Sequence, residues 1–302
     1  MDNETKNKAP LFKKIAERYL RKPTKYGLPK SETCVRNIRW MINYFEGKLI
    51  SDIKRADITD LREYLLYERE LKSSTVNTYT TYLRAILHYA RDELEVVDTI
   101  PKIVSLEENQ KELVLSHQQL RDFLHVVDEL RYDMIKFDIH VGQRNANVRL
   151  MRWDELDEKY KFWTIKSVFQ KNKKPLIIPI NRDARKILKL RWKKKLKLQD
   201  EKPELGEIEH VFFQDNGKPF SRSGLVNKTW RSYVKKARLP QGTTFHTLRH
   251  MFATLHIEHG TDQSELMAVG GWLNTRSVQR YLHIRNKHKG NVAQRLEGVV
   301  TY

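Results

Sequence analysis

The stretch HTLRHMFAT, residues 246–254, opens a helix that we expect over 247–259. His246 and Arg249 lie three residues apart at the start of this helix, so their side chains should share a face. The first turn of a helix has free backbone amides that attract anions, and histidine and arginine add further donors. The stretch suggests a phosphate clamp, although taken alone so short a pattern more often belongs to a surface histidine and arginine without a role.

The charge of the chain points to the same kind of ligand. The 302 residues include 57 Lys and Arg against 38 Asp and Glu, which gives a formal net charge of +19. Such a surplus attracts a polyanion, and nucleic acid is the first candidate because each neutralised phosphate releases counterions. A membrane surface is the second candidate, but no stretch approaches the roughly 18 apolar residues that a span requires.

Cellular location is read from the N-terminus and the cysteine count. Residues 1–8 are polar and lack the apolar core of a secretion signal. The single cysteine, Cys34, excludes an internal disulfide and a multi-cysteine zinc site. We therefore expect a cytoplasmic protein that works on nucleic acid and not on a membrane.

The N-terminal third of the chain predicts a small all-helical domain. After a tail over residues 1–10, four stretches with helical spacing of apolar residues fill residues 11–100. The third runs from about Asp57 to Glu70, and the fourth begins near Ser74, a candidate N-cap. Residues 101–113 lose the helical period and are interpreted as a linker between domains.

Residues 114–302 predict a mixed α/β domain in which helices dominate. Ser116 with Gln119 forms a capping-box pattern at its start. We expect strands over 162–168, 176–180 and 211–213, and helices over 224–237, 247–259, 262–268 and 275–283. The expected fold is thus mainly α with a small β-hairpin.

Two basic positions in this domain could serve a phosphate. Arg144 follows closely on Gly142, whose lack of a side chain suits a tight turn that aims the arginine. Lys171 lies on the turn between the first two expected strands, where it could act as a donor or general acid. Because Lys173 and Lys174 stand beside it, the hairpin could equally do no more than grip DNA phosphates.

The last candidates lie near the C-terminus. Trp272 follows two glycines, and Tyr281 comes nine residues later on a short expected helix. A tyrosine in this setting is usually a packing residue. Each of these signals is weak by itself, but their order and spacing along the chain are specific.

In that order and spacing the chain resembles the tyrosine recombinases, also called phage-integrase-type recombinases. Their signature is an arginine after Gly-x, a lysine on a β-hairpin, His-x-x-Arg, a Gly followed by His or Trp, and a tyrosine nine residues further on. The matching positions are Arg144, Lys171, His246, Arg249, Trp272 and Tyr281. The resemblance covers the whole second domain and extends to the first, which is similar to the four-helix, SAM-like core-binding domain of the family.

The resemblance implies a chemistry that these residue types can perform. Tyr281 would attack a DNA phosphodiester and form a 3′-phosphotyrosyl bond, without metal, ATP or any other cofactor. Arg144 and Arg249 would neutralise the phosphate, and His246 would assist proton transfer from Tyr281. Lys171 would protonate the leaving 5′-oxygen.

Two positions depart from the commonest form of the signature. Trp272 stands where many relatives have histidine, and it can donate its indole N–H but cannot act as an acid or base. The family often has an acidic residue three positions after its first arginine, and here that position is Asn147. We expect this change to affect the support of the site and not the activity itself.

The resemblance also implies partners. We expect double-stranded DNA attachment or recombination sites, a homotetramer on that DNA, and host accessory DNA-bending proteins. Apolar residues after Tyr281 would suit a tail that docks on a neighbouring protomer or packs on its own domain: Val292, Leu296, Val299 and Val300. Since only about ten residues precede the first expected helix, we expect no extra N-terminal domain for accessory arm sites.

Several functions stay open at this level. We favour an integrase of a phage or mobile element over a Xer-type chromosome or plasmid dimer resolvase. A non-catalytic DNA-binding relative and a type IB topoisomerase fit less well, because all the signature residues are present and the first domain is helical. A zinc hydrolase is also considered, since His246 and His250 are four apart on one helix; but position 247 is Thr where such enzymes have Glu.

Overall fold

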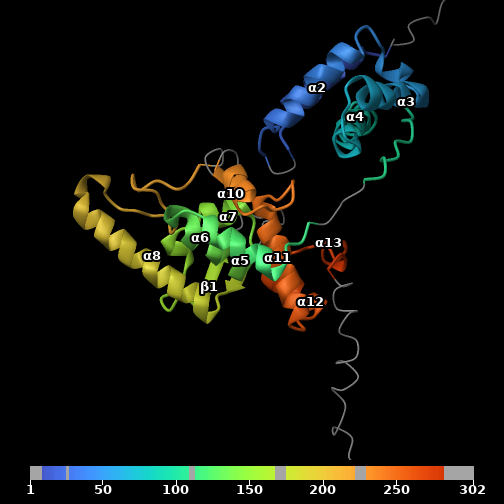
Figure 1. Ribbon diagram of the computed structural model, residues 1–302. Coiled ribbons are helices and arrows are strands. Elements are labelled where there is room, and N and C mark those ends of the chain that lie inside the picture. Colours follow the sequence, from blue (N-terminus) through green and yellow to red (C-terminus); the bar gives the residue numbers. More distant parts are fainter. Residues whose placement is uncertain (1–8, 25–26, 109–112, 167–174, 222–228, 282–302) are drawn as a thin grey trace, which may run out of the picture. The chain divides into compact units, whose positions relative to one another are not determined.

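The chain forms two compact units, Met1–Lys111 and Glu112–Tyr302, in a computed structural model, and each unit is described by itself (Figure 1). The structure describes residues 9–24, 27–108, 113–166, 175–221 and 229–281. Among them, no helix is long and apolar enough to cross a membrane.

The first unit is helical throughout its described part. Its elements are α1 (Phe12–Arg21), α2 (Glu32–Tyr44), the 3-10 turn Ile50–Asp52, α3 (Arg55–Glu63), the π-helical turn Tyr64–Glu68 and α4 (Ser73–Asp92). The expected third helix is therefore an α-helix that widens into a π turn before it ends. The prediction of Ser74 as an N-cap was wrong, because α4 begins at Ser73 after Lys72 and no side chain caps it.

The core of this unit lies between α1, α2, α3 and α4. Phe12, Leu61 and Leu83 are completely buried there, which removes their apolar surface from water and holds the helices together. The segment after α4 also packs on this unit. Ile103 is buried, and the side-chain amide of Asn77 exchanges two hydrogen bonds with the backbone of Leu106, at 2.9 and 2.7 Å.

The second unit places its helices around a two-stranded antiparallel sheet. Its elements are α5 (His117–Val126), α6 (Glu129–Val141), α7 (Asn145–Arg149), the 3-10 turn Trp153–Glu155, β1 (Phe162–Ile165), β2 (Leu176–Pro179), α8 (Arg182–Glu201), the 3-10 turn Pro203–Leu205, α10 (Trp230–Lys236), α11 (Phe245–Glu258), α12 (Gln263–Gly270) and α13 (Arg276–Gln279). The capping box of Ser116 with Gln119 is confirmed at the start of α5.

The expected hairpin is confirmed as well. β1 and β2 pair with Phe162 opposite Pro179 and Ile165 opposite Leu176. The expected strand over 211–213 was wrong, because the chain there makes only isolated bridges, Arg152 with His210 and Phe213 with Pro219. Its apolar residues are buried in the core without a strand partner of sufficient length.

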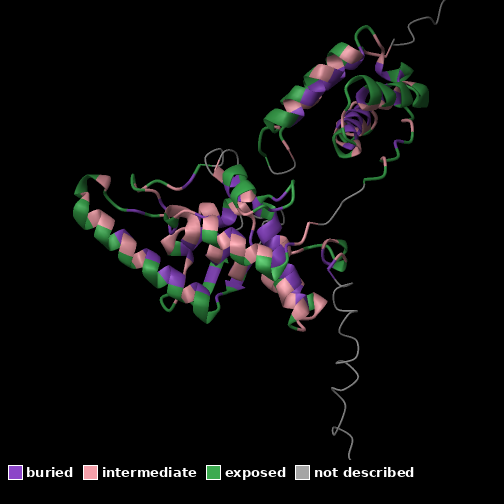
Figure 2. Ribbon diagram, in the orientation of Figure 1, coloured by how far each residue is buried: buried purple, intermediate pink, exposed green. Residues whose placement is uncertain are grey.

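α6 is the central helix of the second unit. It packs against α8 and α11, and its buried Phe137 contacts the rings of Trp163 and Phe212. Figure 2 shows that much of α11 is buried as well. Helices therefore dominate the fold, with one small antiparallel sheet, as the sequence predicts. Because α6 and α11 lie side by side, the turn after α6 meets the first turns of α11.

Candidate active site

The turn after α6 is shaped by Gly142. This residue ends the helix in the left-handed region, with φ +58°, and a Cβ atom placed on it would lie 2.2 Å from Cδ1 of Phe252 on α11. Only glycine combines this conformation with so close an approach. Arg144 then directly precedes α7 and is half-buried. The tight turn expected from the glycine is thus present.

A buried carboxylate supports the same turn. Asp138 on α6 is fully buried, and its Oδ1 accepts a hydrogen bond of 2.9 Å from the backbone N–H of Gln143. Its Oδ2 has no hydrogen-bond partner among the described residues. Burial raises the pKa of Asp138 well above its usual value, while this hydrogen bond and the charge of Arg249 lower it. Sequence reasoning missed this residue, since an aspartate within a helix carries no signal of burial.

Arg249 joins the turn to α11. The residue is 2% exposed, and its Nη1 donates to the carbonyl oxygen of Gly142 at 2.8 Å. Its guanidinium carbon lies 3.9 Å from the centre of the Trp272 ring, a cation–π contact. Burial lowers the pKa of Arg249 to about 10, and the nearby charge of Arg144 adds to this effect. The two arginines are therefore close enough for the charge of one to lower the pKa of the other.

Two glycines bring Trp272 over Arg249. A Cβ atom on Gly270 would lie 1.8 Å from the Trp272 ring, so the indole lies directly against the glycine. Gly271 ends α12 with φ +66°, and a Cβ atom there would lie 2.3 Å from Leu176 at the start of β2. Lys171, Lys173 and Lys174 lie outside the described residues.

The strands that flank Lys171 nevertheless have a defined end. Leu176 pairs with Ile165 as the last described pair of the hairpin, and Leu176 contacts Gly271. The last described pair of the sheet therefore lies beside the residue that precedes Trp272.

Tyr281 lies with its ring inside the protein and its hydroxyl at α11. It is 2% exposed and packs in a small core with Phe252 and Val278. Its Oη lies 2.5 Å from Nδ1 of His250, and its ring centre lies 6.4 Å from that of Trp272. The sequence raised His250 only as a candidate zinc ligand, and its contact with Tyr281 is not visible from spacing.

The two histidines on the first turns of α11 differ in exposure. His246 is exposed, whereas His250 is half-buried, and their rings meet edge to face with centres 4.9 Å apart. Partial burial and nearby positive charges, those of Arg249 and Arg280 among them, lower the pKa of His246, and the pKa of His250 falls to about 4. Both rings are therefore neutral at pH 7 in the free protein.

His246 and Arg249, which the sequence predicts to share a helix face, differ in exposure. Arg249 is turned into the protein towards Gly142 and Trp272, while His246 stays at the surface, because α11 packs closely on α6. The structure brings together Arg144, His246, Arg249, Trp272 and Tyr281 from three separate segments. No group of three metal-ligating side chains occurs within the described ranges.

Asn147 occupies the position where an acid was considered. It is 9% exposed, and its Nδ2 has no partner within the described part of the chain. The carboxylate that influences the buried arginine is instead that of Asp138, one helix earlier. An acid therefore lies near the arginines even though position 147 lacks one.

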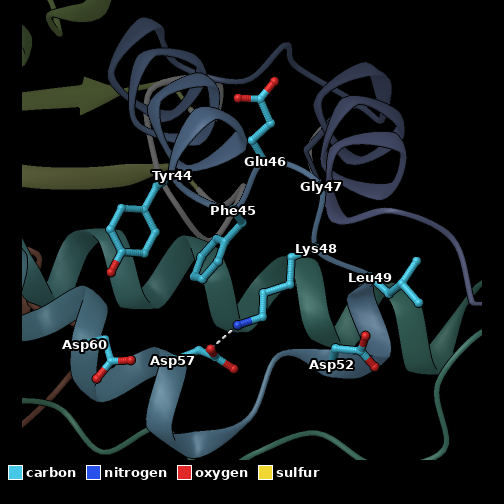
Figure 3. A pocket seen from close by; sticks show the side chains of 9 residues that line it. All are labelled: Tyr44, Phe45, Glu46, Gly47, Lys48, Leu49, Asp52, Asp57 and Asp60. Atoms are coloured by element: carbon cyan, nitrogen blue, oxygen red, sulfur yellow. Dashed lines mark hydrogen bonds and ion pairs between the residues drawn. The ribbon is translucent and has the colours of Figure 1, made fainter.

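A pocket in the first unit has the opposite character. Figure 3 shows Lys48 turned towards Asp57, with which it forms an ion pair. Four carboxylates line this pocket together with the lysine, those of Glu46, Asp52, Asp57 and Asp60. Their combined negative charge disfavours the binding of phosphate there.

Comparison with known proteins agrees with the geometry of the second unit. The profile of the phage integrase family matches residues 113–288, more than half of the chain. The integrase of Salmonella phage P22 is 23% identical over 238 residues, which cover 75% of this chain and 58% of that protein. Tyrosine recombinase XerD of Listeria monocytogenes is 23% identical over 269 residues, covering 82% of this chain and 86% of that protein.

A solved structure shows the same fold. The Tn1549 transposon integrase in complex with circular intermediate DNA is 17% identical and has a TM-score of 0.67, and the match covers 90% of this chain and 95% of that one.

Proposed function

Since this chain belongs to the phage integrase family of DNA-cleaving and rejoining recombinases, we propose that it recombines specific DNA sites through a covalent bond to Tyr281. One observation carries the proposal. Tyr281 and Trp272 form one cluster with the buried Arg249 of α11, a separate segment, and the turn of Arg144 lies beside this cluster. Burying the charge of Arg249 costs free energy unless an opposite charge compensates it, and a DNA phosphate bound beside Tyr281 would supply that charge.

The roles in this proposal follow from the donors available. The phenol of Tyr281 attacks phosphorus, and the bond to the 5′-oxygen breaks, so the DNA keeps a 3′-phosphotyrosyl link. Arg144 and Arg249 donate to the non-bridging oxygens, where negative charge develops. Trp272 holds the guanidinium of Arg249 and offers its indole N–H. Lys171 gives the proton that the 5′-oxygen takes up, and a 5′-hydroxyl later reverses the steps.

The proposed substrate is double-stranded DNA with a recombination site. The net charge of +19 supports binding to phosphates, and the solved relatives include an integrase bound to circular intermediate DNA. We propose that four protomers act together on two sites. Since the P22 integrase and the Tn1549 integrase are among the relatives, integration or excision of a mobile element is the role that we favour.

A dimer resolvase is the second candidate role. It is favoured by the match to XerD, which spans 86% of that protein. The two roles differ in their substrates: an integrase joins two different sites, whereas a resolvase acts on two copies of one site. A plasmid assay with either pairing of candidate sites distinguishes them.

The chemistry is tested by covalent trapping. Protein is incubated with a nicked duplex that carries a candidate site, in the presence of EDTA and without ATP, then denatured and separated beside Tyr281→Phe. We expect a DNA-linked band with the natural protein and none with the variant. If no band forms on any site that the protein binds, it is a non-catalytic DNA-binding relative.

A further inference from the structure

The hydroxyl of Tyr281 lies beside a ring nitrogen of His250. The distance from Oη to Nδ1 is 2.5 Å, and the ring centres are 5.7 Å apart. The resemblance places His246 in the role of proton acceptor, but His246 is exposed and lies one helical turn earlier on α11. The geometry thus indicates different roles for the two histidines.

We propose that His250 is a catalytic residue that accepts the proton of Tyr281 when the tyrosine attacks DNA. This inference rests on the proposed function of Tyr281 as nucleophile. The proton moves from Oη of Tyr281 to Nδ1 of His250 as the bond from Oη to phosphorus forms and the bond to the 5′-oxygen breaks. On rejoining, His250 returns the proton to Tyr281. The ring must carry its other hydrogen on Nε2 for Nδ1 to accept.

The surroundings of His250 keep it unprotonated and therefore able to accept. The charged or titratable groups that act on it within the described residues are His246 and Arg249 from α11, and Arg280 and Tyr281 from the segment after α13. No carboxylate within the described ranges is among them. Burial and the positive charges of this set lower its pKa to about 4 in the free protein.

We expect bound DNA to raise the pKa of His250. A phosphodiester at Arg249 brings a negative charge next to the cations that depress the basicity of His250. Its affinity for a proton therefore rises when substrate is present, which is the moment when Tyr281 must lose one. The exposed His246 is free to face the phosphate, where it can donate to an oxygen.

Two substitutions separate proton acceptance from simple positioning. His250→Asn places an amide oxygen close to the position of Nδ1, so it keeps a hydrogen-bond acceptor for the hydroxyl but cannot take its proton. His250→Phe keeps the ring shape and removes the acceptor. Thermal unfolding of each variant confirms that it is folded before its rate is measured.

His256→Asn is the matched control. His256 lies on the same helix, is also half-buried, and its Nδ1 is 2.9 Å from the hydroxyl of Thr261. It thus has the same type of contact, from a ring nitrogen to a hydroxyl, but not with Tyr281. We expect this variant to form covalent product at the rate of the natural protein.

The measurement is the single-turnover rate of covalent DNA product between pH 6 and pH 9 on a nicked site. We expect a rate that hardly changes with pH for the natural protein, and a loss of ~100-fold or more at pH 7 for both His250 variants. Their deficit should shrink by up to tenfold per pH unit as the phenol, with its usual pKa near 10, ionises unaided.

The other outcomes overturn the inference in distinguishable ways. If His250→Asn matches the natural protein while His250→Phe is slow, His250 only positions the hydroxyl. A deficit that is constant across the pH range means a structural effect, and unchanged rates in both variants mean no role. If the natural protein itself forms no Tyr281-dependent product, the proposed function fails first.

Discussion

Arg249 donates from Nη1 to the carbonyl oxygen of Gly142, 107 residues earlier in the chain, at 2.8 Å. This bond ties the first turns of α11 to the turn that carries Arg144. It also explains why the arginine can be buried, since one N–H is satisfied by the backbone and the face of the guanidinium rests on Trp272. The two arginines are therefore positioned as one unit.

Replacing Arg249 by lysine should remove chemistry and leave binding largely intact. A lysine cannot donate to Gly142 and to a phosphate from one planar group, so we expect the rate of covalent product to fall by ~100-fold or more. DNA affinity should change little, because it is spread over many phosphate contacts.

Arg191→Lys is the matched control for this change. Arg191 is also buried, donates to the carbonyls of Val211 and Phe213, and lies 4.2 Å from the Phe213 ring, outside the cluster. It should lower thermal stability without changing the rate per folded molecule. Equal rates for Arg249→Lys and the natural protein would contradict the proposed role.

Asp138→Asn should change how stability depends on pH. The folded state holds the proton of Asp138 more tightly than the unfolded state, so this group favours folding at low pH and loses that contribution as pH rises above about 4. Asparagine has no charge to bury and can still accept from Gln143. We therefore expect the melting temperature of the variant, relative to the natural protein, to be higher at pH 8 than at pH 5.

Asp133→Asn on the same helix provides the contrast. Asp133 pairs with Lys194 at 3.0 Å and Arg191 at 3.7 Å, so its substitution should lower the melting temperature. If the melting temperatures of both variants change with pH in the same way, the effect does not come from the burial of Asp138.

Gly142→Ala should destabilise the second unit more than a positive φ alone explains. Gly47 in the first unit also has a positive φ, +74°, but no atom within 4 Å of a Cβ position, so Gly47→Ala should cost only the backbone strain, about 1–2 kcal/mol. At Gly142 the methyl group also meets the ring of Phe252, and α6 and α11 must separate. Denaturant unfolding of the two variants measures the difference, and equal losses would mean that the contact is soft.

Trp272→Phe should keep more activity than Trp272→Ala. Phenylalanine still offers a ring to Arg249, whereas alanine removes a contact worth ~2 kcal/mol when desolvated, or ~30-fold in rate. Trp192→Ala is a control, since Trp192 lies 4.7 Å from the amine of Lys195, outside the cluster. The ranking is read from single-turnover rates, and equal loss in both Trp272 variants would assign the effect to the indole N–H.

Local rules in the sequence predicted most of the elements. The capping box at Ser116, the antiparallel hairpin and the glycine turn at Gly142 depend on neighbours in sequence, and all three are present. Ser74 failed as a cap because Ser73 already lies within the helix, and that one-residue difference is not visible in the periodicity.

The site was only partly predictable for a different reason. The signature motifs named the side chains that gather, but burial of Arg249, the support from Asp138 and the contact of His250 with Tyr281 arise from packing between distant segments. The spacing of residues in a helix shows which of them share a face, but it does not show which face other segments will bury.

The acidic pocket of the first unit has a consequence for how DNA is met. Four carboxylates gathered on one side of an otherwise basic chain give that unit an electrical polarity. We expect these carboxylates to repel the phosphates of an approaching duplex, which would bias the orientation in which DNA first meets this unit.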